Sequence, residues 1–340
     1  MKFSILIPVY RAEKYLAETI QSCLEQTEDL SCEILLAEDG SPDASGEICD
    51  RFASEYPERI RVLHLPHQGT VKTRRAAIRE ARGDYLIWVD SDDTLLPGAL
   101  VKLAACVNEH PAVDIVIYEM NFRQEIDGRT EARPPLSQQP RLLDAKEKNS
   151  LYELLIAGSR LDSLCIKMIK ASLMQEDPSD YSLCENNPYG EDVLHCLYPL
   201  TRAASVLLIP DVLYQYRIHE ESVMHIWDEA KAEQRLNPAK WSFFEPFLEE
   251  WGMADISHRD RLKASSYKAV LDGLLHLWQH GGDRQKLKAF ANDFARNHPE
   301  MKELAASPHI ARRLRFQLKA FAHGRLSFLV LSLRLYKLLK

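Results

Sequence analysis

The sequence predicts an α/β fold in which a mainly parallel β-sheet is flanked by helices and is followed by a C-terminal helical region. Over the first 120 residues, short runs of Val, Ile and Leu alternate with amphipathic helical patterns, which is typical of βαβ units. Beyond about residue 226 the apolar spacing is helical throughout. The chain has 340 residues, 46% of them hydrophobic, so a large buried core is available.

The alternating part contains the strands and helices that the pattern predicts with the least ambiguity. Strands are expected at residues 3–9, 33–37, 60–65, 85–89 and 115–118. Helices are expected between them at residues 12–26, 45–56, 72–82 and 97–108. In such a sheet, ligands bind outside the carboxyl ends of the strands, so the residues that follow each strand are the first candidates for a site.

The chain between residues 121 and 222 has a weaker pattern, with polar residues and prolines in its first part. In order, we expect a loop over 124–148, helices over 151–174 and 191–200, and strands over 205–209 and 213–217. A domain boundary is expected near residue 222. It divides the chain into residues 1–222 and a helical domain of residues 223–340.

Composition and charge exclude several classes of protein. Seven cysteines without a CxxC pair indicate reduced thiols and a cytoplasmic location, and exclude a disulfide framework. No signal peptide is expected, and the longest apolar run, residues 326–333, is too short to span a bilayer. Residues 304–340 carry eight Lys or Arg and no Asp or Glu, which is a charge of +8. Because the whole chain has a net charge of −7, the rest of it has a net charge of −15. Nucleic acid is a poor partner for so acidic a body.

The common nucleotide-binding motifs are missing. The first glycine of the chain is Gly40, so the turn after the first strand has none of the glycines that a dinucleotide fold needs. No GxxxxGK[ST] motif is present either. The sequence therefore excludes NAD, FAD and P-loop nucleotide sites.

Acidic residues follow two of the expected strands. Asp90 and Asp92 come directly after the fourth strand and share one face of an extended chain, where two carboxylates suit Mg²⁺ or Mn²⁺. One such triplet is expected by chance, and Asp93 is equally able to cap the next turn. Asp39 follows the second strand, and the alternative there is a turn with Asp43 as a helix cap.

Two helices begin with charged residues. The helix expected at 72–82 carries Lys72, Arg74 and Arg75 in its first half, where cations oppose the helix dipole and hint at an anionic ligand. A solvated face is the simpler explanation. Glu191 and Asp192 open another helix, either as an active-site pair or as ordinary capping residues.

Taken in order, these motifs resemble those of the family 2 glycosyltransferases, which have the Rossmann-like GT-A fold. The resemblance covers about residues 3–222. It rests on the segments SILIPVY (4–10), EKYL (13–16), EILLAEDGS (33–41), ARGDY (81–85), VDSDD (89–93), GED (190–192) and YQYRIH (214–219).

The resemblance implies an inverting enzyme that moves a sugar from a nucleotide-diphosphate donor, with UDP favoured, to a hydroxyl of a glycan or lipid-linked glycan. It implies that residues 1–120 hold the nucleotide sugar and residues 121–222 the acceptor. By their places in the motifs, the donor-binding residues are Pro8, Tyr10, Glu13, Asp39, Arg74, Asp90 and Ser91. The same comparison implies that Asp90, Asp92 and His219 hold Mn²⁺ or Mg²⁺. Asp192 takes the place of the general base, with Glu191 as its rival.

Some residues depart from the family pattern. Arg11 and Arg75 stand where the family commonly has Asn, and Glu38 where it has Asp, which leaves the identity of the donor open. Two other functions remain as alternatives. One is a catalytically silent, GT-A-like protein that binds sugar nucleotides. The other is a sugar-phosphate nucleotidylyltransferase, although its glycine-rich basic turn after the first strand is missing here.

The basic tail, residues 311–340, carries apolar residues at helical spacing. They are Leu314, Leu318 and Phe321, followed by Phe328, Leu331, Leu335 and Leu338. Basic amphipathic helices of this kind lie in anionic membrane interfaces, which would place the protein on the inner face of a membrane. The alternative is a terminal helix docked on the helical domain. The sequence leaves both open.

Overall fold

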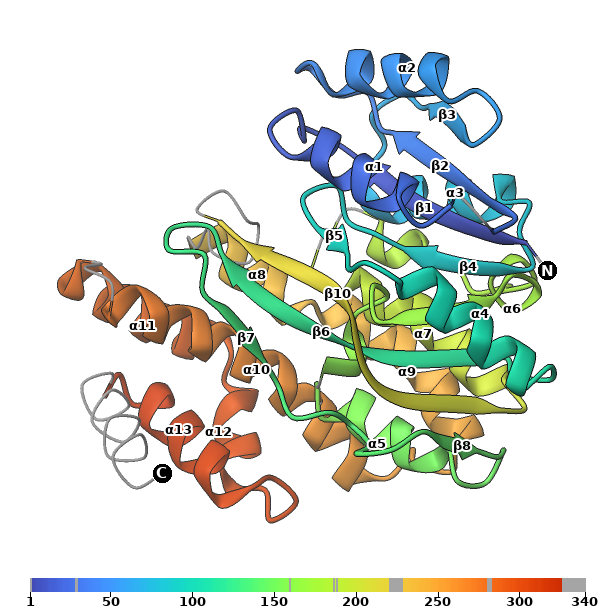
Figure 1. The fold of residues 1–340 in the computed structure, drawn as a ribbon. Helices are drawn as coiled ribbons and strands as arrows, with labels where there is room; N and C mark the ends of the chain where they lie inside the picture. Colours follow the sequence, from blue (N-terminus) through green and yellow to red (C-terminus); the bar gives the residue numbers. More distant parts are fainter. Residues whose placement is uncertain are drawn as a thin grey trace. The chain divides into compact units, whose positions relative to one another are not determined.

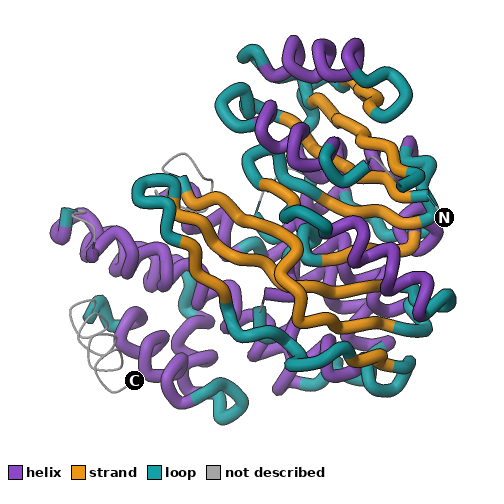
Figure 2. The backbone as a smooth tube through the Cα atoms, in the orientation of Figure 1, coloured by secondary structure: helices purple, strands orange, loops and turns teal. Residues whose placement is uncertain are grey.

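The computed structural model describes residues 2–27, 30–158, 160–185, 187, 189–219, 229–279 and 283–325. Contacts divide the chain into two compact units. The sheet unit comprises residues 1–151 and 160–219, and the helical unit comprises residues 152–159 and 220–340. Figure 1 labels the elements of each unit, and Figure 2 shows that the strands lie in the first.

The first strands of the sheet unit are parallel and lie in the order β3-β2-β1-β4. They are β1 (Phe3–Val9), β2 (Cys32–Glu38), β3 (Ile60–His64) and β4 (Tyr85–Trp88). The helices between and after them are α1 (Leu16–Leu24), α2 (Ser45–Glu55), α3 (Thr70–Glu80) and α4 (Ala99–Glu109). The side chains of β1 and β2 are buried on both faces, as expected for parallel strands covered by helices. The predicted α/β fold is confirmed.

The rest of the sheet is mixed rather than mainly parallel. β9 (Lys167–Lys170) lies antiparallel between β4 and β6 (Ile115–Gln124), whereas β10 (Val206–Ile218) is parallel to β6. Short strands complete the edges, and all of them pair antiparallel. They are β5 (Thr94–Leu95) on β10, β7 (Thr130–Ala132) on β6 and β8 (Arg141–Leu143) on β10. Two of these short strands, β7 and β8, fall in the stretch expected to be a loop.

The helix expected over 151–174 was wrong. That stretch contains the end of α5 (Asn149–Ile156), a 3-10 turn (Arg160–Asp162), β9 and α6 (Ala171–Gln175). A short apolar run has no periodicity that separates a buried strand from a buried helix, and residues 164–169 are such a run. Their burial between two other strands decides the matter.

The two strands expected over 205–217 form one long strand. In β10 the register against β6 shifts between Leu208 and Val212 and again between Val212 and Tyr214. Pro210 lies inside the first shift, where the bulge tolerates a residue that cannot donate to the ladder. The strand therefore continues to Ile218 and carries His219 beyond the end of the sheet. The expected helix over 191–200 is present as α7 (Glu191–Arg202).

The helical unit contains the later helices. They are α8 (Glu229–Leu236), α9 (Pro238–Glu250), α10 (Ile256–Gln279), α11 (Arg284–Asn297), α12 (Glu300–Ala306) and α13 (Arg312–Ala322). Its core is built around Tyr267, Phe294 and Phe321, which are at most 1% exposed. A search of the described residues finds no helix with the length and apolarity needed to cross a membrane.

The described part of the basic tail lies in α13. Leu318 and Phe321 are buried in the core of the helical unit, and Leu314 packs against that core. The opposite side of α13 is exposed at Arg312, Phe316, Lys319 and His323. Phe328, Leu331, Leu335 and Leu338 lie outside the described residues.

Candidate active site

The turn that follows β4 is built around the buried Asp93. The Tyr214 hydroxyl donates to Asp93 Oδ2 at 2.7 Å and accepts from the Asp90 N–H at 3.1 Å. The Arg217 N–H donates to Asp93 Oδ1 at 2.7 Å. Burial, with the charges of Asp92 and Asp90, raises the pKa of Asp93 well above its usual range. Asp93 therefore ties the end of β10 to the turn, and this sets where Asp90 and Asp92 lie.

Asp92 lies beside His219, the residue after β10. Asp92 Oδ2 and His219 Nε2 are 2.9 Å apart. The imidazole is 7% exposed and packs against the Tyr15 ring, with the centroids 4.6 Å apart. The Arg217 side chain donates from Nε to the Asp92 carbonyl at 2.8 Å. The carboxylate and imidazole are thus held together by contacts from β10 and from the residue before α1.

This pair fits a divalent cation that also binds substrate. Within the described ranges, no three His, Cys, Asp or Glu side chains form a cluster that could hold an ion on their own. Mg²⁺ is usually bound through one or two carboxylates plus phosphate oxygens and water, and Mn²⁺ takes the same oxygen ligands. Asp92 and His219 match that incomplete set, whereas Asp90 has its oxygens engaged by other side chains.

Asp90 is held by Arg74 and Cys165. Arg74 Nη2 donates to Asp90 Oδ1 at 3.0 Å, and the Cys165 thiol donates to Asp90 Oδ2 at 3.3 Å. The guanidinium carbon of Arg74 lies 5.5 Å from the centroid of the Trp88 ring. Arg74 Nη1 also donates to Asp192. One buried cation therefore joins the end of β4 to the start of α7.

Glu191 and Asp192 form the first turn of α7, after Gly190, which has a left-handed φ of 79°. Their side chains are 14% and 23% exposed. Glu191 Oε1 lies 3.9 Å from Arg74, and burial raises the pKa of Glu191 although Arg74 opposes the shift. The Leu164 N–H donates to Asp192 Oδ2 at 3.4 Å. Both carboxylates thus lie on the Arg74 side of the site.

A buried, neutral histidine, His195, contacts the first turn of α7. His195 is fully buried and stacks on Tyr181 with ring centroids 4.6 Å apart. Its Nδ1 lies 2.9 Å from the Glu191 carbonyl, so this nitrogen carries the hydrogen. Burial lowers the pKa of His195 to about 3. His195 therefore positions Glu191 without contributing charge at neutral pH.

Two residues that the resemblance assigns to the donor, Tyr10 and Asp39, lie at the ends of β1 and β2. Tyr10 is 37% exposed and stacks on His67, with centroids 4.3 Å apart and planes 13° apart. Asp39 accepts from the Gln68 N–H at 2.9 Å and from the Gly69 N–H at 3.0 Å. Asp39 is 3% exposed, so its first role in this structure is to shape the loop that starts α3.

The remaining predicted residues make local contacts. Glu13 accepts from the Ala44 N–H at 2.9 Å, just before α2. Pro8 pairs with Ala37 across β1 and β2. The carbonyl of Ser91 accepts from the Thr19 hydroxyl at 3.0 Å. These residues lie along the same end of the sheet as the carboxylates, whereas Arg74, Asp90, Asp192 and Glu191 are directly joined.

Sequence reasoning missed several residues of this network. Cys165 lies in the stretch expected to be helical, so no signal marked it. Tyr214 and Arg217 belong to a recognised segment but were given no role there. His67 follows β3 and could have been found from that position alone, because the ends of neighbouring parallel strands share one edge.

Comparison with known proteins finds similar sequences. Residues 4–160 match the model of glycosyl transferase family 2. The glycosyltransferase GlyG of Streptococcus pneumoniae serotype 4 is 39% identical over 126 residues, which is 37% of this chain and 41% of GlyG. EpsH of Bacillus subtilis is 26% identical over 301 residues, 85% of this chain and 81% of EpsH. This chain thus matches less than half the length of GlyG.

A solved structure shares the fold. The Staphylococcus aureus TarS 1–349 structure in complex with UDP-GlcNAc covers 96% of this chain and 89% of its own, with a TM-score of 0.62 and 19% identity. At this identity the likeness is one of fold. It extends the agreement beyond the matched family segment.

Proposed function

We propose that this chain, whose residues 4–160 match the model of glycosyl transferase family 2, belongs to that family and moves a sugar from a nucleoside-diphosphate donor to a hydroxyl of a glycan or lipid-linked glycan. The observation that carries this proposal is the convergence of Asp90, Asp192 and Glu191 on the buried Arg74, beside the Asp92–His219 pair. These groups lie outside the carboxyl ends of the strands, where the fold binds nucleotides.

A UDP-sugar is the favoured donor. Structures of TarS hold UDP-GlcNAc or UDP on the same fold. In this chain the exposed ring of Tyr10 offers a flat apolar face at the end of β1, as a base needs, with Asp39 and His67 beside it. Arg74, which contacts Asp90, is the cation that we assign to the diphosphate. We assign residues 1–120 to the donor and residues 121–222 to the acceptor.

Asp92 and His219 are the residues that would hold Mn²⁺ or Mg²⁺. A similar fold, that of the mannosyltransferase PcManGT of Pyrobaculum calidifontis, is solved with GDP-Man and Mn²⁺, at 14% identity and a TM-score of 0.51. When bound, the cation supplies Lewis-acid stabilisation of the leaving diphosphate. The chain's own part is to keep the carboxylate and imidazole together, while Arg74 and Cys165 hold the two carboxylate oxygens of Asp90.

Asp192 is the proposed general base. A hydroxyl is a poor nucleophile until a carboxylate takes its proton, and a single displacement needs one such base, which gives inversion. Asp192 opens α7 and is 23% exposed, so it can reach a substrate hydroxyl. Glu191 is more deeply buried, with 14% of its side chain exposed, so it is less accessible to a substrate hydroxyl and is the weaker candidate.

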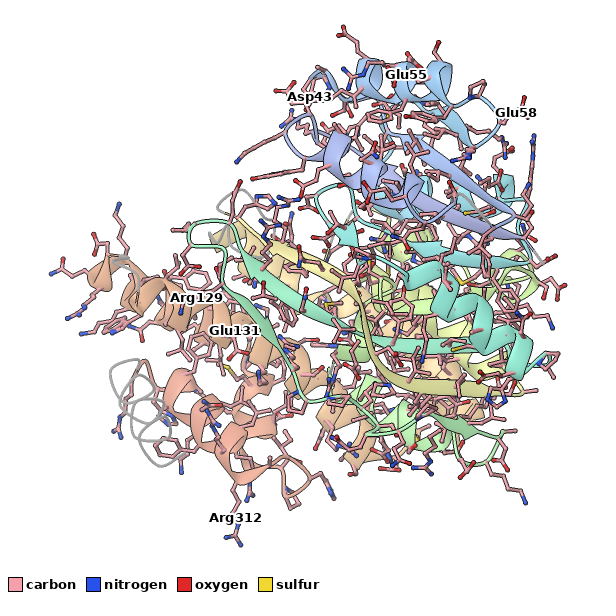
Figure 3. The ribbon with its side chains drawn as sticks, in the orientation of Figure 1. Asp43, Glu55, Glu58, Arg129, Glu131 and Arg312 are labelled. Atoms are coloured by element: carbon pink, nitrogen blue, oxygen red, sulfur yellow. The ribbon has the colours of Figure 1, made fainter. Side chains whose placement is uncertain are left out.

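A cytoplasmic location with peripheral membrane contact is proposed. The seven cysteines are free, which suits a reducing compartment. Leu314, Leu318 and Phe321 of α13 pack inward, so the membrane contact is assigned to the exposed basic side of the helix. Figure 3 shows Arg312 pointing away from the helical unit. An anionic lipid surface complements this charge.

Titration of UDP, GDP and dTDP, and then of their sugar conjugates, into the full chain with Mn²⁺ tests the proposal. We expect UDP to bind and one UDP-sugar to be slowly hydrolysed in the absence of an acceptor. Binding without any hydrolysis or transfer over a broad acceptor panel would favour the silent binding protein. Pyrophosphate release from UTP and a sugar 1-phosphate would show a nucleotidylyltransferase instead.

A further inference from the structure

Arg74 has more negative partners than it can neutralise. Its side chain is 4% exposed and donates to Asp90 Oδ1 at 3.0 Å and to Asp192 Oδ1. Glu191 Oε1 lies 3.9 Å from the same guanidinium. Three carboxylates thus surround one positive charge in a buried site. Burial raises the pKa of Glu191, although Arg74 opposes the shift.

Asp192 is poorly prepared to accept a proton in this arrangement. Its Oδ1 is bound by Arg74, and its Oδ2 accepts from the Leu164 N–H at 3.4 Å. A cation in direct contact favours the charged form of a carboxylate and so weakens it as a base. The contact that neutralises Asp192 therefore also opposes the step proposed for it.

The guanidinium is built to change partners. It has five N–H donors in a planar fork that matches carboxylate and phosphate alike. Among the described residues its Nε has no acceptor, so one donor is unused. The guanidinium carbon lies 5.5 Å from the centroid of the Trp88 ring, so the fork that Asp90 and Asp192 share also has an aromatic contact.

We propose that Asp192 and the donor diphosphate compete for Arg74, so that donor binding draws the guanidinium off Asp192 and prepares this carboxylate as the base. The donor therefore binds before the acceptor hydroxyl can be activated. This inference rests on the proposed function, because it needs a diphosphate next to Asp90. It adds that one arginine couples the donor site to the base.

The competition has a measurable consequence that requires no acceptor. If Asp192 competes with the diphosphate for Arg74, removing the charge of Asp192 should tighten binding of the diphosphate, because the two binding equilibria are linked. Coupling of this kind is typically about 5- to 150-fold in affinity. We measure UDP binding by calorimetry, with and without Mn²⁺, for the full chain and for Asp192→Asn. We expect Asp192→Asn to bind UDP about tenfold more tightly or better.

Two controls separate this competition from a general loss of negative charge. Glu191→Gln removes a carboxylate near the same guanidinium, but at 3.9 Å, so it should change UDP affinity much less. In the Arg74→Gln background, Asp192→Asn should no longer tighten binding. Arg74→Lys, which keeps the charge but cannot bridge two carboxylates, serves as the background if Arg74→Gln does not fold.

The outcomes are distinct. Equal UDP affinity in wild type and Asp192→Asn overturns the inference, as does an equal gain from Glu191→Gln or a gain that persists without Arg74. If wild type binds none of UDP, GDP or dTDP, the proposed function itself fails. Tightening that depends on Arg74 supports both.

Discussion

The carboxylates after β4, Asp90 and Asp92, and the carboxylate of Asp192 in α7 have different proposed roles. Asp192→Asn tests that difference. The amide keeps the shape of the side chain but cannot take a proton. A positioned base is worth about 10²–10⁴ in rate, so transfer should fall at least about a hundredfold although UDP binds more tightly. Single-turnover assays with the donor found by titration would measure this. If Glu191→Gln abolishes transfer and Asp192→Asn barely slows it, the two roles are exchanged.

Asp92 should act on the donor alone. Asp92→Ala removes the carboxylate that lies 2.9 Å from His219, so Mn²⁺-dependent UDP affinity should be lost together with turnover. Asp144→Ala is the matched control, because it removes an exposed carboxylate that accepts from the Lys146 and Glu147 N–H groups and is not among the predicted site residues. Transfer that continues undiminished in excess EDTA would contradict a metal role for this pair.

His195 gives the stability of the chain a pH dependence. Its pKa in the folded state is about 3, well below the usual value of 6.5, because the ring is buried. Between these values the unfolded chain binds the extra proton, so the free energy of unfolding falls as pH falls from 6.5, by at most about 1.4 kcal/mol per pH unit. Urea denaturation at pH 7, 6 and 5 should show a smaller loss for His195→Phe. Identical slopes would mean that His195 is not buried as described.

At the scale of the elements, the start of α3 depends on Gly69. This residue has a φ of 88° and a ψ of 161°, a conformation that side chains with a Cβ rarely adopt. Its N–H also binds Asp39. Gly69→Ala should therefore shift the loop that carries His67 and weaken UDP binding as well as lowering stability by about 1–3 kcal/mol.

Gly98 supplies the control for this loop. It precedes α4 with a φ of 79°, and a Cβ there would meet nothing within 4 Å. Gly98→Ala should lower the melting temperature without changing UDP affinity. If both alanine variants leave UDP affinity unchanged, the Gly69 loop plays no part in the donor site.

The elements also show where sequence reasoning stops. β1 to β4 were predicted because each is a buried apolar run bounded by turns and alternating with an amphipathic helix. β9 was missed because the short run of residues 164–169, apolar except for Lys167, has no periodicity that separates a strand from a helix. Lys167 is fully buried, and its Nζ donates to the Leu161 carbonyl at 2.6 Å and to the Ser163 carbonyl. Such pairing is decided by tertiary contacts that no local pattern records.

For the site as well, the residues could be predicted from local motifs but their contacts could not. Asp90, Asp92, Asp192 and Arg74 are predicted from the sequence because they stand in motifs at strand or helix ends. Their mutual contacts could not be predicted, because Arg74 and Asp192 are 118 positions apart in the chain. Cys165, which bonds Asp90, reaches it through the strand pairing that was missed.

At the scale of the whole molecule, charge is segregated along the chain. The net charge of the chain is −7, yet residues 304–340 contain eight Lys or Arg and no Asp or Glu. Within the helical unit, α13 buries Leu318 and Phe321 and exposes Arg312, Phe316 and Lys319. An exposed aromatic ring between basic side chains is typical of a surface that rests on an anionic interface.

Vesicle co-sedimentation tests this surface without unfolding the helical unit. Arg312→Gln with Lys319→Gln removes two exposed charges and leaves the buried side of α13 intact. Each basic residue near an anionic membrane is worth about 1 kcal/mol, so binding to phosphatidylserine-containing vesicles should weaken by more than about tenfold at low salt. The wild-type chain should lose its binding as salt is raised, because exposed charges are screened.

Lys286→Gln with Lys302→Gln removes the same charge from exposed positions on α11 and α12 and should have a smaller effect. If the two pairs weaken binding equally, net charge alone is responsible. If neither changes it, α13 packs on the protein and has no membrane role.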